Sequence, residues 1–302
     1  DLLPAPLQLT GLDLPAWLTD QLVRHGIDPT ALAQALLGPD DQWLLFETPQ
    51  TLRPTDRNGT SDIYRLDLIA DTLALVSRTP TGTAGNGPSR YPTTTAAGDW
   101  VVFQSDATDL VPDDHNGVTD LYLHDLPLGH LWRLTPTADQ ATAHPSLDAT
   151  GQDLVYDQQD PAGHRAILAD HPWGLAAPQP LSLAQDASGS PLDNHPPAAR
   201  RDGRYLAYLE TPAAPADPAG AAPTAATCQV HFYDRERDRY HRQPCPAPLT
   251  AAAEDARPAF SADGAQVGWY LFGVDEPVIL TNPLLPPLTT MPFSRVVIPR
   301  GD

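Results

Sequence analysis

Short apolar segments recur along the chain and predict buried β-strands. Four of them follow one frame, in which a Pro and a Gly are separated by five residues and an apolar run with a central aromatic residue comes next. The frame occupies 92–98, 145–151, 197–203 and 258–264, and the runs read WVVFQS, DLVYDQ, YLAYLE and QVGWYL. Short apolar runs of this length, which follow turn residues, predict strands.

These segments define a repeat of about 55 residues. The aromatic positions are separated by 57, 53, 52 and 61 residues, and they are Phe46, Phe103, Tyr156, Tyr208 and Trp269. A second series of short apolar segments has the same period, and each is followed by a turn and another strand. Its members end at Asp67, Asp125, Asp170, Asp234 and Asn282. Each repeat therefore contains an inner segment, two middle strands and an outer strand.

A repeating unit of this kind predicts an all-β fold. A four-stranded antiparallel unit with one apolar face cannot bury that face alone, whereas units stacked around an axis can. We therefore expect a β-propeller of five four-stranded antiparallel blades. The alternative is six blades, with a split closing blade built from both ends of the chain, where 2–10 reads LLPAPLQLT and 293–299 reads FSRVVIP.

The N-terminal segment departs from the repeat. We assign 1–37 to a closing strand and two short helices, 38–290 to the propeller and 291–302 to a C-terminal tail. Asp13 is a candidate N-cap for a first helix. Asp28 followed by Pro29 is a second start signal, and Gly38 is the corresponding stop. We expect the closing strand to complete the last blade.

Composition narrows the function classes. The chain has 38 acidic residues against 18 basic ones, all of them Arg, and a formal net charge of −20. Such a chain is not expected to bind nucleic acid by neutralising phosphates. It contains no apolar run of membrane-spanning length, so no membrane span is expected. Its 35 Pro and 20 Gly favour turns, in agreement with a turn-rich β protein.

The two cysteines, Cys228 and Cys245, flank a segment that reads as a β-hairpin. If the turn is centred between Glu236 and Arg237, the two cysteines lie opposite each other on antiparallel strands, within reach of a disulfide. The alternative is a pair of buried thiols. A disulfide implies an oxidising compartment, so we expect a secreted, periplasmic or cell-surface protein.

The first two repeats carry a resemblance to a known family. The segments DRNGTSDIYRLDL (56–68) and DDHNGVTDLYLHDL (113–126), together with the Pro-x5-Gly frame, resemble the TolB-like, WD-like propeller repeats of bacterial periplasmic and secreted proteins. The resemblance covers about residues 35–290. It implies a propeller fold, export and protein–protein binding, and it carries no enzyme mechanism.

The same two segments hold a candidate metal site. Oxygen-bearing side chains alternate around a tight Gly turn, as a hard cation such as calcium requires. The candidate ligands are Asp56, Asn58, Asp62, Asp114, Asn116 and Asp120. The alternative is an Asx turn, in which Asp or Asn caps a glycine turn between two strands.

A second group of candidates lies near the predicted inner segments. The residues expected at the mouth of a central channel are Tyr91, His144, His195, Arg257 and Asp148. We expect a non-enzymatic exported propeller that binds another protein or copies of itself. One alternative is a structural subunit of an extracellular filament or surface layer. The other is a hydrolase or lyase with its site in the channel.

Overall fold

The computed structural model places twelve stretches of the chain, and they fall into two compact units. The first unit ends at Pro145 and the second begins at Ser146. The described residues are 7–9, 14–38, 41–135, 140–172, 178–182, 192–194, 196–200, 202–212, 228–246, 258–261, 264–269 and 278–285.

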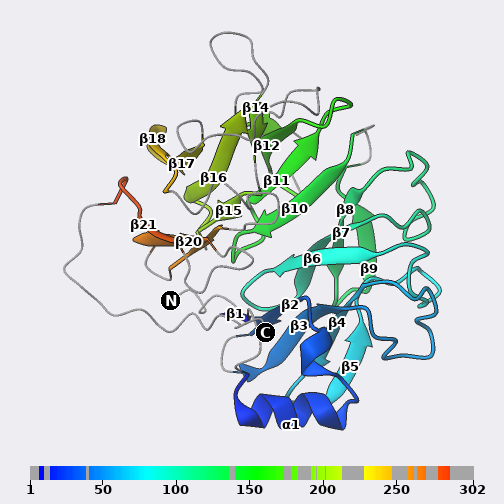
Figure 1. The fold of residues 1–302 in the computed structure, drawn as a ribbon. Helices are drawn as coiled ribbons and strands as arrows, with labels where there is room; N and C mark the ends of the chain where they lie inside the picture. Colours follow the sequence, from blue (N-terminus) through cyan, green and yellow to red (C-terminus); the bar gives the residue numbers. More distant parts are fainter. Residues whose placement is uncertain are drawn as a thin grey trace, which may run out of the picture. The chain divides into compact units, whose positions relative to one another are not determined.

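Antiparallel sheets account for nearly all the regular structure of the first unit (Figure 1). The first sheet has the order β1-β2-β3-β4-β5, with strands Leu7–Leu9, Gln34–Leu37, Trp43–Thr48, Asp62–Asp67 and Thr72–Leu75. The second has the order β6-β7-β8-β9, with strands Ser89–Thr94, Trp100–Ser105, Asp120–Asp125 and His130–Arg133. Both sheets follow the chain order, as the blades of a propeller do.

The remaining strands form three further sheets. The third has the order β10-β11-β12-β13, with strands Thr142–Leu147, Leu154–Gln159, Arg165–Asp170 and Gln179–Pro180. In the fourth, β14 and β15 both pair with β16, which is followed by β17 and β18. These strands are Leu192–Asn194, Ala198–Ala199, Tyr205–Pro212, Gln229–Asp234 and Arg239–Pro244. The fifth is β19-β20-β21, with strands Pro258–Phe260, Gln266–Trp269 and Val278–Thr281.

The described strands therefore confirm an all-β propeller with five blades. The ends of the chain differ from expectation in one respect. Strand β1 pairs with β2 of the first blade, with Gln8 opposite Leu36, and does not complete the last blade as predicted. The tail at 291–302 lies outside the described residues.

The prediction of two N-terminal helices is half right. Helix α1 spans Ala16–Arg24, while the second segment forms only a 3-10 turn at Pro29–Ala31 and then becomes strand β2. Asp28 does cap that turn, because its carboxylate accepts the N–H of Thr30 at 2.9 Å. The second predicted helix stops after this turn because residues 34–37 pair with β3 instead. This pairing outweighs the good helix propensity of the Ala, Gln and Leu residues in that segment.

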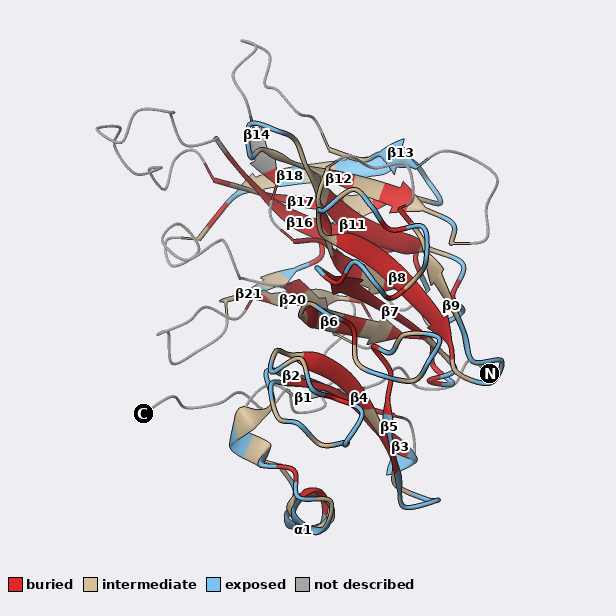
Figure 2. Ribbon diagram, turned by 90° about the vertical axis from the view of Figure 1, so that its right-hand side faces the viewer, coloured by how far each residue is buried: buried red, intermediate tan, exposed pale blue. Residues whose placement is uncertain are grey.

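The middle strands of the first unit are buried on both faces (Figure 2). On one face of β3, Leu44 and Phe46 pack with the side chains of α1, and Leu18 and Leu22 of that helix are fully buried. On the other face, Leu45 packs with residues of the second blade. Burying one such aliphatic side chain contributes about 1.5–3 kcal/mol. The apolar runs are continuous because each face of the strand has a neighbour.

The glycine of the repeated frame marks a close approach between consecutive blades. Gly98 has φ +71°, and a Cβ there would lie 2.4 Å from the indole of Trp43 in the first blade. Within the second unit, a Cβ at Gly203 would lie 2.5 Å from Asp153, and one at Gly264 would lie 2.5 Å from Arg200. Only glycine combines this backbone conformation with room for the neighbouring blade.

The predicted disulfide is present between Cys228 and Cys245, whose Cα atoms are 5.3 Å apart. Strand β17 pairs with β18 in the register Asp234 opposite Arg239, which places the turn centre where the sequence predicted it. None of the helices among the described residues has the length and hydropathy to cross a bilayer.

Replacing Gly98 by Ala tests the close approach. Gly98→Ala is expected to cost more unfolding free energy than Gly59→Ala by about 1–3 kcal/mol, since only the former overpacks a neighbour. Gly59 has φ +68° but nothing within 4 Å of its Cβ position, so its variant reports backbone strain alone. Urea denaturation measures both, and equal losses would contradict the packing argument.

Reduction of the disulfide is expected to lower the free energy of unfolding by about 3 kcal/mol, because the bridge restricts the unfolded chain. Chemical denaturation with and without a reductant measures this change. The control is the double variant Cys228→Ala, Cys245→Ala, which should lack any response to the reductant. If the reductant leaves the unfolding free energy of the wild-type protein unchanged as well, the bridge does not stabilise the fold.

Candidate functional site

Two residues on the innermost strands of consecutive blades have an unusual backbone. Tyr91 in β6 has φ +58° and His144 in β10 has φ +52°. Each immediately precedes the Pro of the repeated frame, and β6 shifts register between Arg90 and Thr93. A left-handed conformation at a residue other than Gly costs of order 1–3 kcal/mol and needs support from its surroundings.

The support comes from polar side chains of the preceding blade. The carboxylate of Glu47 accepts the N–H of Tyr91 at 3.0 Å, and the amide oxygen of Gln104 accepts the N–H of His144 at 2.9 Å. Glu47 and Gln104 directly follow the repeat aromatics, and both are buried. We call these two bonds the backbone latches. They satisfy the N–H groups that the irregular strand leaves without a ladder partner.

The latches bring the two side chains together. The rings of Tyr91 and His144 lie with centroids 4.8 Å apart and tilted by 50°. Tyr91 is partly exposed and His144 is 8% exposed. A phenol and an imidazole in contact combine aromatic surface with groups that can transfer protons, and such pairs occur in both recognition and catalysis.

The other channel-mouth candidates do not join this pair in the described part of the chain. Asp148 follows β10 and is buried in the turn that leads to β11. Its carboxylate accepts the N–H groups of Thr150, Gln152 and Asp153, so it stabilises that turn. His195 and Arg257 lie outside the described residues.

The candidate calcium loops form two closely similar hydrogen-bond networks. In the first, Tyr64 donates to Asp56 at 2.5 Å, Asn58 donates to Asp62 at 2.8 Å, and Ser77 donates to Asp62 at 2.6 Å. The second network repeats these bonds 58 residues later in the chain, from Tyr122 to Asp114, from Asn116 to Asp120 and from Thr135 to Asp120. In each loop the Asn oxygen also accepts a backbone N–H two residues on, which is an Asx turn.

The loops differ in how their carboxylates are neutralised. In the second loop, a guanidinium nitrogen of Arg133 lies 2.8 Å from Asp114 and 3.6 Å from Asp120. It therefore takes the position that a bound cation would need. In the first loop, Leu75 stands opposite Tyr64 as Arg133 stands opposite Tyr122.

The first loop consequently buries its carboxylates with no cationic side chain paired to them among the described residues. Asp56 Oδ1 is buried and has no hydrogen-bond partner, and burial, reinforced by the charge of Asp56, raises the pKa of Asp62 to about 7. Among the described residues, no group of three or more His, Cys, Asp or Glu side chains is arranged to hold a metal ion. Calcium binding stays a prediction, and only the first loop offers an unpaired carboxylate oxygen for it.

Three of the residues that shape these sites were missed from the sequence. Glu47 and Gln104 are the next-to-last residues of β3 and β7, and Arg133 is the last residue of β9. Their position directly after the repeat aromatic was a usable signal for the first two. No sequence signal pointed to Arg133, because it is distant along the chain from the carboxylates that it pairs with.

Asp62 should make the protein less stable at high pH. Since its pKa is raised in the folded state, its stabilising contribution is complete below about pH 4 and is lost as the pH rises through about 7. Asp62→Asn should remove this loss, which we place at about 2–4 kcal/mol between pH 4 and 8. Denaturation at several pH values compares it with wild type and with Asp120→Asn, where Arg133 limits the effect. Parallel profiles for wild type and Asp62→Asn would contradict this assignment.

Comparison with known proteins supports the fold. No protein-family model matches the sequence, and no curated protein matches it either. Among solved structures, the chain is similar to TolB from Acinetobacter baumannii, with 15% identity and a TM-score of 0.53 over 92% of this chain and 60% of that one. A putative TolB from Agrobacterium tumefaciens matches with 16% identity and a TM-score of 0.45, over 68% and 62% of the two chains.

An enzyme is also among these structures. Oligogalacturonate lyase in complex with manganese matches with 14% identity and a TM-score of 0.50, over 85% of this chain and 68% of that one. The expectation that the chain is not an enzyme is therefore contradicted, because proteins that share its fold include catalysts. This chain spans about 60% of the length of the Acinetobacter TolB. Its five blades, its repeat loops and the similarity to the Acinetobacter TolB together give the chain the fold of a TolB-like β-propeller.

Proposed function

We propose that this chain is an exported β-propeller that binds another protein through the edge bearing Tyr91 and His144. The observation that carries the proposal is the pair of backbone latches, which hold two aromatic residues in a strained backbone conformation with their rings in contact. Strained positions that the surroundings maintain are typical of binding and active sites. Aromatic side chains are also enriched among the residues that dominate binding energy.

Two further observations support this proposal. The resemblance of the first two repeats to TolB-like propeller repeats implies protein binding, and the disulfide supports export, since such bridges persist in oxidising compartments. The net charge of −20 favours a partner with a basic surface, because opposite charges accelerate association. We therefore expect the rate of association to fall as salt is added.

The test replaces each ring while keeping the backbone. Tyr91→Asn and His144→Asn are suitable because Asn tolerates a positive φ. A partner captured by the wild-type protein from extracytoplasmic extract is purified and titrated against each variant. Both variants should keep the wild-type melting temperature and bind at least tenfold more weakly. The control is Trp17→Ala, which removes another exposed aromatic side chain.

The opposite result would refute the proposal. If both Asn variants bind the partner as tightly as the wild type, the edge with Tyr91 and His144 is not the contact site. If Trp17→Ala weakens binding more than they do, the contact lies at α1 instead.

The second candidate is a lyase or hydrolase acting at the same edge. It is favoured by the contact between a phenol and an imidazole, since both groups can transfer protons, and by the similarity to oligogalacturonate lyase. Incubation with oligogalacturonate, followed by the ultraviolet absorbance of an unsaturated product, separates the two functions. Turnover that is lost in both Asn variants would favour catalysis over protein binding.

A further inference from the structure

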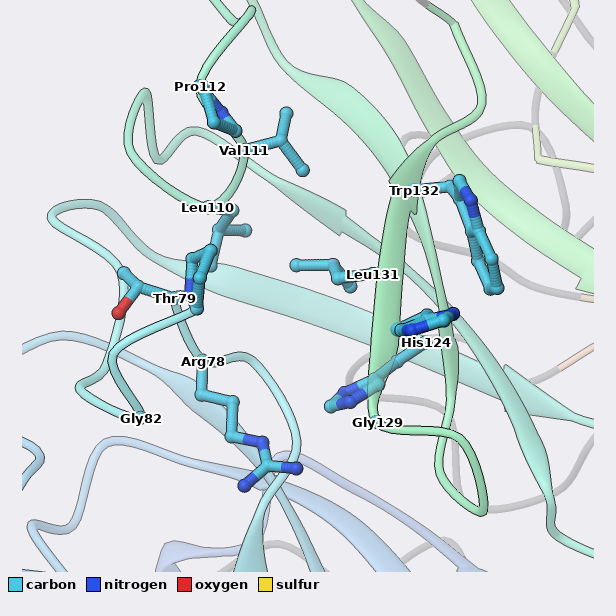
Figure 3. Close-up of a pocket in the computed structure, with 12 residues that line it drawn as sticks. Arg78, Thr79, Gly82, Leu110, Val111, Pro112, His124, Gly129, Leu131 and Trp132 are labelled. Carbon is cyan, nitrogen blue, oxygen red and sulfur yellow. The ribbon is translucent and has the colours of Figure 1, made fainter.

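The first unit contains a cavity that the proposed function does not use. It has a volume of about 470 Å³ and lies between the loop after β5, the loop after β7 and the hairpin of β8 and β9 (Figure 3). Figure 3 shows Thr79, Leu110 and Val111 on one side of it and Leu131 on the other. Cavities of 300–1,000 Å³ with mostly apolar walls are the usual size of small-molecule sites.

The charge of the lining is opposite to that of the chain. The lining includes Arg78, His124 and His130 and no Asp or Glu, although acidic residues outnumber basic ones 38 to 18 in the whole sequence. A negative group is thus favoured inside it.

Arg78 is the fixed cation of the cavity. Its guanidinium forms no ion pair or side-chain hydrogen bond with any residue in the described part of the chain, and it is exposed. It lies beside Gly129, since a Cβ built there would be 3.9 Å from Arg78 Nη2. A guanidinium in this setting can bind a carboxylate with two parallel hydrogen bonds.

The neighbouring histidine is held in its neutral form. His124 is buried, and its Nδ1 lies 2.7 Å from the carbonyl oxygen of Val76, to which it donates. Burial lowers the pKa of His124, and the positive charge of Arg78 adds to the effect. Of these two neighbouring groups, Arg78 is therefore the one that offers positive charge to a ligand.

We propose that this cavity binds a small organic acid, with its carboxylate on Arg78 and its apolar body between Val111 and Leu131. The apolar walls distinguish this ligand from inorganic anions, which would gain nothing from contact with Leu or Val side chains. His130 and Trp132 also line the cavity, and their rings meet edge to face with centroids 5.5 Å apart. The proposal is independent of the partner-binding edge.

The experiment compares an acid with its amide. The full-length protein is titrated by calorimetry with 4-phenylbutyrate and with 4-phenylbutyramide, which share an apolar body and differ in charge. The acid should bind at least tenfold more tightly than the amide. Inorganic phosphate is the third probe, and it should not displace the acid.

Three variants test whether Arg78 causes the preference for the acid over the amide. Arg78→Gln should bring the acid down to the affinity of the amide, and Arg78→Lys should restore part of the difference. Arg24→Gln on α1 is the matched control for loss of one positive charge and should bind like wild type. Equal affinities for acid and amide, an unchanged affinity in Arg78→Gln, displacement by phosphate, or no binding of the acid to the wild type would each overturn the proposal.

Discussion

The close packing of each blade against the next is the constraint on which the rest of the structure depends. In the first unit, Trp43 fills the space in front of Gly98, while Leu45 and Ile63 join the apolar side chains of the second blade. A blade with two apolar faces has no stable existence alone, so its neighbour is part of its core. The recurring glycine, the continuous apolar runs and the polar latches are three consequences of this single requirement.

Much of the fold could be predicted because this packing imposes a period on the sequence. The frame of Pro and Gly located the blades, and the symmetry of the hairpin located the disulfide between Cys228 and Cys245. The N-terminus was harder, since residues 34–37 have good helix propensity and become a strand only through pairing with β3. Local preference and tertiary pairing disagree there, and pairing prevails.

The candidate sites were less predictable because they depend on neighbours in space. Tyr91 and His144 could be proposed from their place before the repeated Pro, but the latches from Glu47 and Gln104 come from another blade. The two acidic loops look alike in sequence, yet one is neutralised by Arg133 and the other faces Leu75. Similar motifs in repeats therefore do not imply similar electrostatics.

The latches also bear on how such a protein can diversify. Because Glu47 and Gln104 bind the main chain of the following blade, the conformation at positions 91 and 144 is fixed by atoms that every residue except proline possesses. The side chains at those two positions take no part in either bond. A residue that tolerates a positive φ can therefore replace either one while both bonds and the packing of the blades are kept.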